Sequence, residues 1–239
     1  MEKERLENIA TDYNNPLQAR EVSEYEISYC FQIFKRFYQG GSVLEMGPAE
    51  GVMTKHLIRY VESLEVLEGS DTFCKNLKEC YTDLPVHCSL FEEFKPSKTY
   101  NVIIMGHVLE HVESPQKILG LAKTWLKRDG ILFAAVPNSH SIHRQAAVTM
   151  GILEDEKCMS EADVFHGHRR IYDLESFLQE FRDSGLTIIS SGGYWLKPLS
   201  NSQIQAHWSK EMINAFMYLG EQYPQIAGDI YVVATYSKE

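Results

Sequence analysis

The chain has 239 residues, of which 44% are apolar and 23% are charged. These fractions are ordinary for a soluble globular protein and exclude a disordered chain or a fibre. The formal net charge of −10 disfavours nucleic acids and anionic membranes as partners, because affinity for phosphates comes from lysine and arginine. Five scattered cysteines with no CxxC pair, and no apolar run of membrane-span or signal-peptide length, lead us to expect a reduced, cytoplasmic protein.

Short apolar runs alternate with helical stretches through the first 136 residues, a pattern typical of an α/β fold with a mainly parallel sheet. The strands of this part are expected at residues 42–46, 64–67, 85–88, 100–105 and 131–136. The helices are expected at residues 17–38, 50–60, 71–81 and 115–127. The runs at 100–105 and 131–136 are almost wholly apolar, as strands buried on both faces should be.

The alternation of strands and helices breaks after residue 136. Residues 137–170 contain no clear strand, and residues 192–227 separate the last two expected strands, at 186–191 and 229–236. Asp173 caps an amphipathic helix between the two irregular segments. Because no linker divides the chain, we expect one domain over residues 1–239, with an N-terminal cap helix within 1–40 and insertions at 137–170 and 192–227.

A glycine turn joins the first expected strand to the next helix in the segment VLEMGPAEGVMT, residues 43–54. Gly47 and Gly51 allow the backbone to approach a ligand closely, and the following helix presents free N–H groups. The spacing is neither the G-x-G-x-x-G of nicotinamide enzymes nor a phosphate loop, which ends in G-K-[ST]. Glu45 at the strand end would repel a pyrophosphate and suits a cationic amino or sulfonium group.

A second acid, Glu68, ends the second expected strand about 20 residues beyond the glycine turn. In nucleotide-binding α/β folds, an acid at this place accepts hydrogen bonds from both ribose hydroxyls. The alternative is a solvated carboxylate at a strand end. The glycine turn and Glu68 together favour a nucleoside ligand.

These features, with NVIIMGHVLEHV at residues 101–112, resemble the class I S-adenosylmethionine-dependent methyltransferases, and among them the small-molecule branch of ubiquinone- and sugar-type enzymes. The resemblance covers residues 40–191 and the final strand. It implies a Rossmann-like three-layer α/β sandwich whose seven-stranded, mainly parallel sheet has its last strand antiparallel and carries helical insertions over its carboxyl edge. It implies S-adenosyl-L-methionine as cofactor and S-adenosyl-L-homocysteine as product. The turn departs from the commoner Cys-Gly-x-Gly form, and Ser89 stands where the family often has Asp or Asn.

By position, the resemblance implies contacts to the methionine part, the ribose and the adenine of the cofactor. The residues expected to make these contacts are Tyr13, Glu45, Gly47, Pro48, Gly51, Glu68, Gly69, Ser70, Leu90, Phe91, Gly106, His107 and Val108. Tyr13 is expected to close over the cofactor from the N-terminal segment, and ordinary surface packing is its alternative.

The two insertions are expected to cover a pocket for the methyl acceptor, because ligands of open α/β sheets bind beyond the carboxyl ends of the strands. The run HGHRR-x-Y at 166–172 resembles a family segment that precedes the last long helix, so His168 and His166 are catalytic candidates, with His143 of the same insertion as a third. The acceptor-binding candidates are His111, Asn138, His140, Arg144, Arg169, Tyr172, Tyr194, Lys197 and Asn201. Packed or capping histidines, and arginines paired with the acids of 154–163, are the alternatives.

A zinc site is a weaker interpretation of the same histidines. His140, His143, His166 and His168, with Cys158, could supply ligands, but their spacing matches no established zinc motif. We therefore expect no metal site from the sequence.

The expected reaction is direct displacement of the methyl group onto oxygen or nitrogen of a small polar metabolite, with a histidine as base. A sugar, a nucleotide-sugar or a phospho-compound would fit, and the arginines favour an anionic acceptor. The alternatives are a catalytically silent, cofactor-binding regulatory module, and methylation of a protein or an RNA. The negative charge disfavours RNA, and MGHV stands where amine-methylating enzymes carry Asn-Pro-Pro-Tyr. A monomer or a homodimer is expected.

Overall fold

The computed structural model describes residues 2–12 and 20–236, and within them a seven-stranded sheet of order β3-β2-β1-β4-β5-β7-β6. The strands are β1 (Ser42–Met46), β2 (Ser63–Glu68), β3 (Val86–Cys88), β4 (Tyr100–Gly106), β5 (Leu126–Pro137), β6 (Thr187–Tyr194) and β7 (Asp229–Thr235). The helices are α1 (Glu2–Asp12), α2 (Arg20–Lys35), α3 (Val52–Leu57), α4 (Asp71–Cys80), α5 (Pro115–Trp125), α6 (Ile142–Thr149), α7 (Glu161–Phe165), α8 (Leu174–Asp183), α9 (Asn201–His207) and α10 (Lys210–Gln222).

The strands of the sheet are parallel except around β7. β1 pairs in parallel with β2 and β4, and β4 with β5, whereas β7 runs antiparallel between β5 and β6. The expected mainly parallel sheet with an antiparallel last strand is confirmed. The carboxyl ends of β1, β2, β4 and β5 consequently meet at one edge, which positions the loops that follow them as one site.

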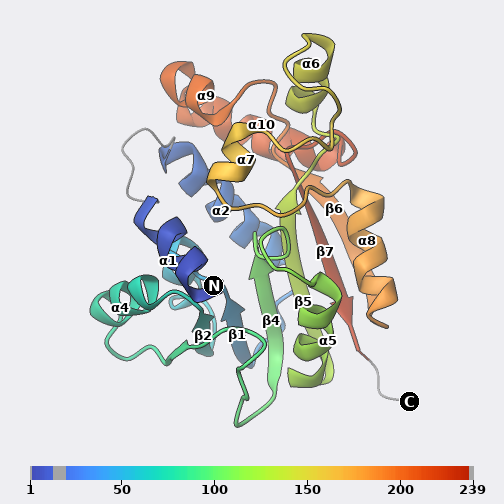
Figure 1. Cartoon of the computed structure of the whole chain (residues 1–239). Helices are drawn as coiled ribbons and strands as arrows, with labels where there is room; N and C mark the ends of the chain where they lie inside the picture. Colours follow the sequence, from blue (N-terminus) through green and yellow to red (C-terminus); the bar gives the residue numbers. More distant parts are fainter. Residues whose placement is uncertain (1, 13–19, 237–239) are drawn as a thin grey trace.

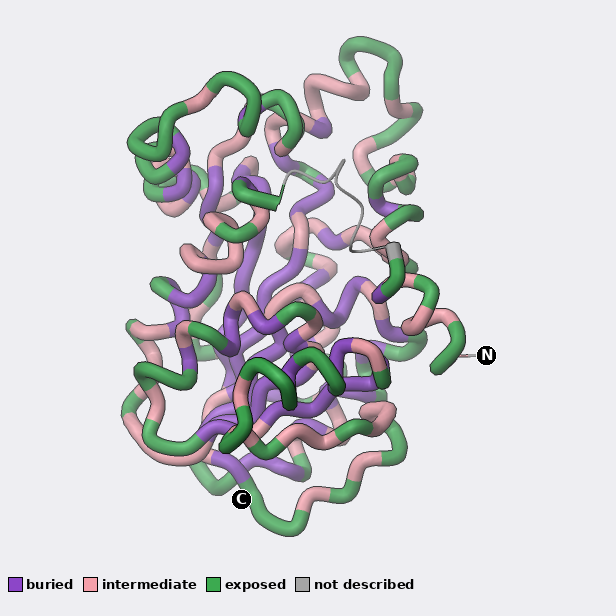
Figure 2. The backbone as a smooth tube through the Cα atoms, turned by 90° about the vertical axis from the view of Figure 1, so that its left-hand side faces the viewer, coloured by how far each residue is buried: buried purple, intermediate pink, exposed green. Residues whose placement is uncertain are grey.

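Alternate residues of the central strands supply two hydrophobic clusters, one on each face of the sheet. Leu44 and Ile103 belong to the cluster that includes residues of α5 and α8. Val43 and Ile104 belong to the cluster that includes residues of α2 and α10. Figure 1 shows helices on both sides of the sheet, and Figure 2 shows the buried strands enclosed by more exposed segments. The three-layer sandwich expected from the sequence is confirmed.

The elements differ from the sequence prediction in several places, among them the shorter helices α2 and α3 and the following three. Helix α1 was not expected as a separate helix, because EKERLENIATD has only a few apolar residues. Helix α5 ends at Trp125, and β5 begins at once with Leu126. Strand β6 continues to Tyr194, so the second insertion begins after that residue rather than at 192.

The glycines at 192 and 193 suggested the wrong end for β6. They pair with Tyr231 and Ile230 of β7. A Cβ atom on Gly192 would lie 2.8 Å from the Tyr231 ring, and one on Gly193 would lie 2.9 Å from Pro224. These glycines therefore permit a close approach of neighbouring groups within a strand, and do not end it.

Residues 137–170 and 195–227, called the roof below, carry α6, α7, α9 and α10. Figure 1 shows these helices together at the end of the molecule toward which β4 and β5 point. Among the described residues, no helix is long and apolar enough to cross a membrane.

Candidate functional site

The turn between β1 and α3 has the backbone geometry that its glycines predict. Gly47 and Gly51 have φ values of 67° and 81°, in the left-handed region that favours glycine. A Cβ atom on Gly47 would lie 2.9 Å from the Val108 side chain. The Gly47 amide donates a hydrogen bond to the Leu67 carbonyl at 2.9 Å, which ties the turn to the end of β2.

The Glu68 carboxylate connects the glycine turn to the start of α4. Its side chain accepts hydrogen bonds from the backbone amides of Ala49, at 3.1 Å, and Ser70, at 2.9 Å. Glu68 is only 5% exposed, and burial raises its pKa. Each carboxylate oxygen has two lone pairs, so Glu68 keeps capacity to accept further hydrogen bonds.

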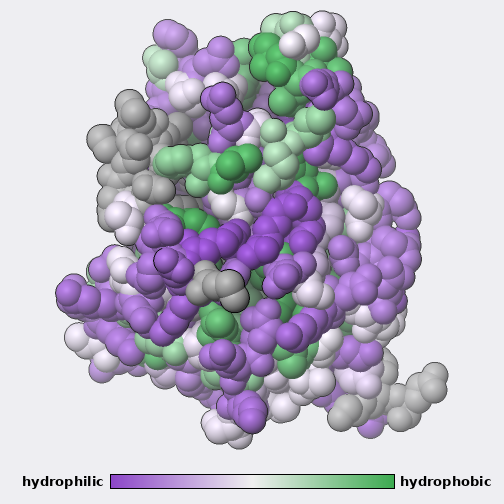
Figure 3. All heavy atoms as spheres, in the orientation of Figure 1, coloured by the Kyte–Doolittle hydropathy of each residue, from purple (hydrophilic) through white to green (hydrophobic). Residues whose placement is uncertain are grey.

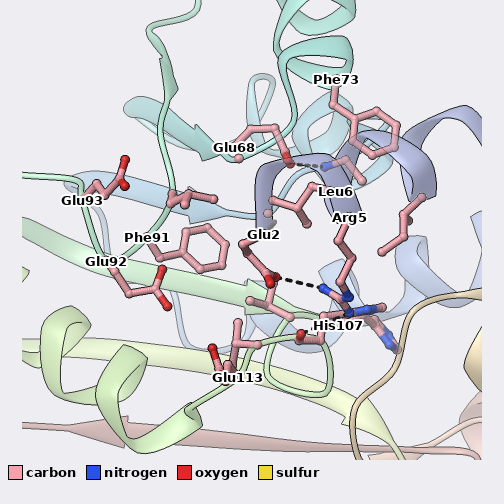
Figure 4. Close-up of a pocket in the computed structure, with 18 of the residues that line it drawn as sticks. Glu2, Arg5, Leu6, Glu68, Phe73, Phe91, Glu92, Glu93, His107 and Glu113 are labelled. Atoms are coloured by element: carbon pink, nitrogen blue, oxygen red, sulfur yellow. Dashed lines mark hydrogen bonds and ion pairs between the residues drawn. The ribbon is translucent and has the colours of Figure 1, made fainter.

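A large cavity of about 300 Å³ lies at the carboxyl edge of β1, β2 and β4. Figure 4 shows Glu68 and Phe91 on its walls, with Leu6 of α1 near both. Its lining comprises Glu2, Arg5, Leu6, Ile9, Gly47, Ala49, Glu68, Gly69, Phe73, Leu90, Phe91, Glu92, Glu93, His107, Val108, His111, Val112, Glu113 and Lys117. The cavity thus combines one buried acid with several apolar and aromatic walls, as a nucleoside requires.

Helix α1 forms one wall of this cavity and is held at both sides. Glu7 accepts hydrogen bonds from the Asp71 amide and the Thr72 hydroxyl, each at 2.6 Å, at the start of α4. On the other side, Arg5 donates to the carbonyl of Gly167. The sequence prediction missed these contacts because they join segments far apart in the chain.

A small cavity of about 90 Å³ lies beside the glycine turn and is lined by Ile27, Cys30, Glu45, Met46, Gly47, Pro48, Ala49, Glu50, Val52, Met53, Gly106 and His107. Glu45 is 2% exposed, and its carboxyl accepts a hydrogen bond from the Thr54 hydroxyl at 2.7 Å. Burial raises the pKa of Glu45 to about 8, and the charge of Glu68 adds to the shift. His107 and Gly47 line both cavities, so the two adjoin there.

His107 lies between the cavities and a set of polar side chains. Its φ of 56° turns the chain sharply after β4. Its Nε2 lies 3.3 Å from the Tyr194 hydroxyl, and its Nδ1 lies 3.5 Å from Glu110 Oε1, which is long for a hydrogen bond. Burial alone would lower the pKa of His107, but the carboxylates of Glu110 and Asp229 raise it to about 9.

A group of polar side chains, called the polar cluster below, consists of Glu26, His107, Tyr194, Lys197, Asn201 and Asp229. The Lys197 ammonium donates to Asn201 Oδ1 at 3.0 Å, and Asn201 Nδ2 donates to Glu26 Oε2 at 3.1 Å. Burial, reinforced by Glu26, raises the pKa of Asp229 well above its usual range. Burial would raise the pKa of Glu26 as well, but Lys197 and Asp229 lower it. Glu26 and Asp229 were absent from the sequence prediction.

The arginines expected to bind an acceptor have partners within the protein. Arg144 Nη1 lies 2.9 Å from Asp163 Oδ2, and its Nε donates to the Glu156 carbonyl at 2.9 Å. Arg169 pairs with Glu2 of α1 at 2.6 Å. The Arg144 contact corresponds to the expected salt-bridge alternative, whereas the Arg169 partner, Glu2, lies outside the acids of 154–163 that were expected. Neither arginine lines the large or the small cavity.

Other acceptor candidates of the roof also bond within the protein. The Asn138 amide donates to two backbone carbonyls, at residues 225 and 227. His140 pairs with Glu156 at 2.5 Å, and the Tyr172 hydroxyl donates to Glu180 at 3.3 Å. Of the expected acceptor residues, His111 lines the large cavity, whereas Tyr194, Lys197 and Asn201 belong to the polar cluster.

The three catalytic candidates occupy different surroundings. His168 Nδ1 lies 3.3 Å from Asp163 Oδ1, and its ring packs edge-on against that of His111 with centroids 4.8 Å apart. Burial lowers the pKa of the His166 imidazole. The charges of Glu26 and Lys197 also act on this pKa, so His166 lies within electrostatic reach of the polar cluster. Burial lowers the pKa of His143 to about 3, which makes it a weak base.

Most of the expected cofactor residues line one of the two cavities. Gly51 precedes α3 and Ser70 caps α4, and neither lines a cavity. Tyr13 lies outside the described residues. The lining residues among them are Glu45, Gly47, Pro48, Glu68, Gly69, Leu90, Phe91, Gly106, His107 and Val108.

The outer surface over these cavities is mostly hydrophilic, as Figure 3 shows. Apolar side chains gather near α6 and α7, where Met150, Ile152 and Val164 are each more than 60% exposed.

The sequence is similar to known methyltransferases. Residues 22–191 match the family described as "Methyltransferase domain". The (S)-coclaurine N-methyltransferase of Thalictrum flavum subsp. glaucum is 22% identical over 204 residues, which are 82% of this chain but 53% of that protein. The ubiquinone biosynthesis O-methyltransferase of Paramagnetospirillum magneticum is 23% identical over 172 residues, 70% of this chain and 68% of that protein.

Solved structures share the fold at low sequence identity. A Thermotoga maritima protein described as a SAM-dependent methyltransferase, "possible histamine N-methyltransferase", has a TM-score of 0.63 at 15% identity, covering 92% of this chain and 97% of its own. The N-methyltransferase NodS from Bradyrhizobium japonicum, solved with S-adenosyl-L-homocysteine, has a TM-score of 0.55 at 12% identity, covering 94% and 90%.

Proposed function

Because the chain belongs to the methyltransferase-domain family, as the sequence motifs predict, we propose that it transfers a methyl group from S-adenosyl-L-methionine to oxygen or nitrogen of a small polar molecule. The observation that carries this proposal is the position of Glu68, buried at the wall of the large cavity with its carboxylate bonded to both the glycine turn and the start of α4. This arrangement suits a nucleoside whose ribose hydroxyls donate to Glu68 and whose adenine packs between Leu90 and Phe91.

The small cavity suits the methionine part of the cofactor. Glu45 lies there in a buried position, and a cationic amino or sulfonium group nearby would favour its ionised form. Gly47 and Gly106 leave room for close approach of the ligand to the backbone. When bound, the cofactor supplies a methyl group on a positively charged sulfur that departs as a neutral thioether.

The polar cluster is the proposed acceptor side. His107 connects the two cavities to Tyr194, so an acceptor held by the polar cluster would face a methyl group near His107. Holding acceptor, methyl and sulfur in line can lower the barrier by about 7–11 kcal/mol. A hydroxyl acceptor must also lose its proton, and His166 is the proposed base of the roof.

The contacts of the arginines change the expected acceptor chemistry. Arg144 and Arg169 are paired with Asp163 and Glu2, so they do not support an anionic acceptor. The polar cluster contains Lys197 together with two acids, Glu26 and Asp229. A neutral hydroxyl or an amine therefore fits better than a phosphate or a carboxylate.

Calorimetry and methyl-transfer assays test this proposal. We expect S-adenosyl-L-homocysteine to bind one per chain, and methyl-labelled S-adenosyl-L-methionine to label members of a panel of small alcohols and amines. Absence of binding at about millimolar ligand would overturn the cofactor assignment. Binding without labelling of any panel member, together with labelling of a protein or RNA substrate, would overturn the small-molecule assignment.

A further inference from the structure

Glu110, His111 and His168 bring three ligand atoms together beside the large cavity. One carboxylate oxygen and one nitrogen from each imidazole lie within 4.8 Å of one another. Glu110 and His111 lie in the loop between β4 and α5, and His168 lies in the roof after α7. Segments distant in the chain thus converge on one point.

The Glu110 carboxylate is buried without a hydrogen-bond donor among the described residues. The residue is 1% exposed, and neither oxygen accepts a hydrogen bond from the described residues. Its nearest ion-pair neighbours are His107 Nδ1 at 3.5 Å and His111 Nε2 at 3.8 Å. His107 can supply one positive charge at 3.5 Å, but no hydrogen-bond donor among the described residues reaches either oxygen, so Glu110 keeps the capacity to bind a further cation.

Both imidazoles are oriented so that one nitrogen is left for such a ligand. His111 Nδ1 lies 3.3 Å from the Gly167 carbonyl, which can only accept, so Nδ1 is the donor and the Nε2 lone pair remains available. His168 Nδ1 lies 3.3 Å from Asp163, whose carboxylate also binds Arg144 at 2.9 Å. A carboxylate or carbonyl behind each imidazole is the usual outer support of metal-binding histidines.

We infer that Glu110, His111 and His168 bind a divalent transition-metal cation, with the Nε2 atoms of both histidines and a Glu110 oxygen as ligands. Two imidazoles and one carboxylate suit Zn²⁺, Co²⁺ or Mn²⁺ better than Mg²⁺ or Ca²⁺, which prefer oxygen ligands alone. Metal–ligand bonds of about 2.0–2.2 Å place ligand atoms roughly 3–4 Å apart, so binding would draw the three atoms together by about 1 Å.

Three protein ligands leave at least one coordination position open. Because His111 lines the large cavity and Glu110 lies 3.5 Å from His107, which contacts Tyr194 of the polar cluster, the open position would lie between the proposed cofactor and acceptor sides. An acceptor oxygen or nitrogen could occupy it. This role in acceptor binding rests on the proposed function, whereas binding of the cation itself does not.

Metal binding by the whole chain tests the inference without any methyl-transfer assay. Chelator-treated protein would be titrated with Co²⁺, followed by its visible absorption, and with Zn²⁺, followed by calorimetry. We expect about one equivalent of metal per chain, and at least a 100-fold higher dissociation constant in Glu110→Gln and His168→Ala. His87→Ala is the matched control, since His87 also pairs with a glutamate, Glu65, at 2.7 Å.

The folding of each variant would be checked by circular dichroism and by binding of S-adenosyl-L-homocysteine. Metal binding that weakens in folded Glu110→Gln and His168→Ala but not in His87→Ala supports the site. Absence of binding in the wild-type chain, equal affinity in a folded site variant, or equal loss in His87→Ala overturns it. Failure of S-adenosyl-L-homocysteine to bind the wild-type chain would instead contradict the proposed function and leave the metal measurement intact.

Discussion

At the large and small cavities, most functional side chains lie at the ends of β1, β2 and β4, and each is positioned by the strand that it follows. At the polar cluster, Glu26, Lys197 and Asp229 come from α2, the roof and β7. Asn201 bonds to both Lys197 and Glu26, and the charges of these two act on Asp229. The residues of the cofactor side are thus positioned by the strands of the sheet, whereas those of the acceptor side are positioned by contacts between segments distant in the chain. Substitutions should therefore separate cofactor binding from acceptor chemistry.

The largest effect on the cofactor side is expected for Glu68→Ala. This change removes the acceptor of the Ala49 and Ser70 amides and of the proposed ribose contacts. We expect the binding free energy of S-adenosyl-L-homocysteine to weaken by about 3 kcal/mol or more, which corresponds to a dissociation constant at least about 100-fold higher. Calorimetry would measure it, with exposed Glu79→Ala as the control, and an unchanged constant in the folded variant would refute the ribose assignment.

On the acceptor side, Lys197→Met should produce the opposite pattern. It keeps the apolar stem but removes the cation that Glu26 and Asp229 face. We expect kcat/KM for methyl transfer to fall about 10- to 100-fold, while the dissociation constant of S-adenosyl-L-homocysteine changes less than about threefold. Lys210→Met, on the exposed start of α10, is the control. Equal losses in cofactor affinity and in turnover would show that the two sides are not separable.

Glu45→Gln should stabilise the ligand-free protein at neutral pH. Folding raises the pKa of Glu45 from 4.5 to about 8, so its contribution to stability is fully present below pH 4.5 and is lost as the pH rises through 8. The neutral amide avoids this loss. Urea unfolding should show a gain of about 1–3 kcal/mol that grows between pH 5 and 8. A gain that does not change with pH would contradict the assigned cause.

The smallest effect on cofactor affinity is expected for substitutions in α1, which forms one wall of the large cavity. Arg5→Ala removes the contact to the Gly167 carbonyl and should raise the dissociation constant of S-adenosyl-L-homocysteine about three- to tenfold. Lys3→Ala removes an exposed pair with Asp71 on the same helix and should change it less than about twofold. Equal effects of the two changes would mean that α1 closes the cavity without help from Arg5.

The two sides also differ in how well the sequence predicts them. The turn at 43–54 and Glu68 were predicted because a strand, a glycine turn and a helix are neighbours in the chain, and the strand end sets where the next side chain lies. Glu26 and Asp229 could not be predicted as a pair, because nothing local distinguishes them from surface acids. Arg144 had several acids within reach in sequence, and only the fold selects Asp163.

Helix α1 and Glu110 show two further limits of sequence reasoning. The polar composition of α1 gives little apolar periodicity, and its stability depends on contacts with α4 and residues 166–170. Glu110 stood within the motif that identified the family, but its isolation from hydrogen-bond donors is a property of the packed structure alone. A buried acid between two histidines in sequence was the available signal.

The structure of the chain with S-adenosyl-L-homocysteine bound tests the central claim most directly. We predict both ribose hydroxyls within hydrogen-bonding distance of Glu68, the adenine between Leu90 and Phe91, and the sulfur facing His107 and the polar cluster. A nucleoside bound away from Glu68, or a sulfur directed away from His107, would contradict the division of the molecule into a cofactor side and an acceptor side.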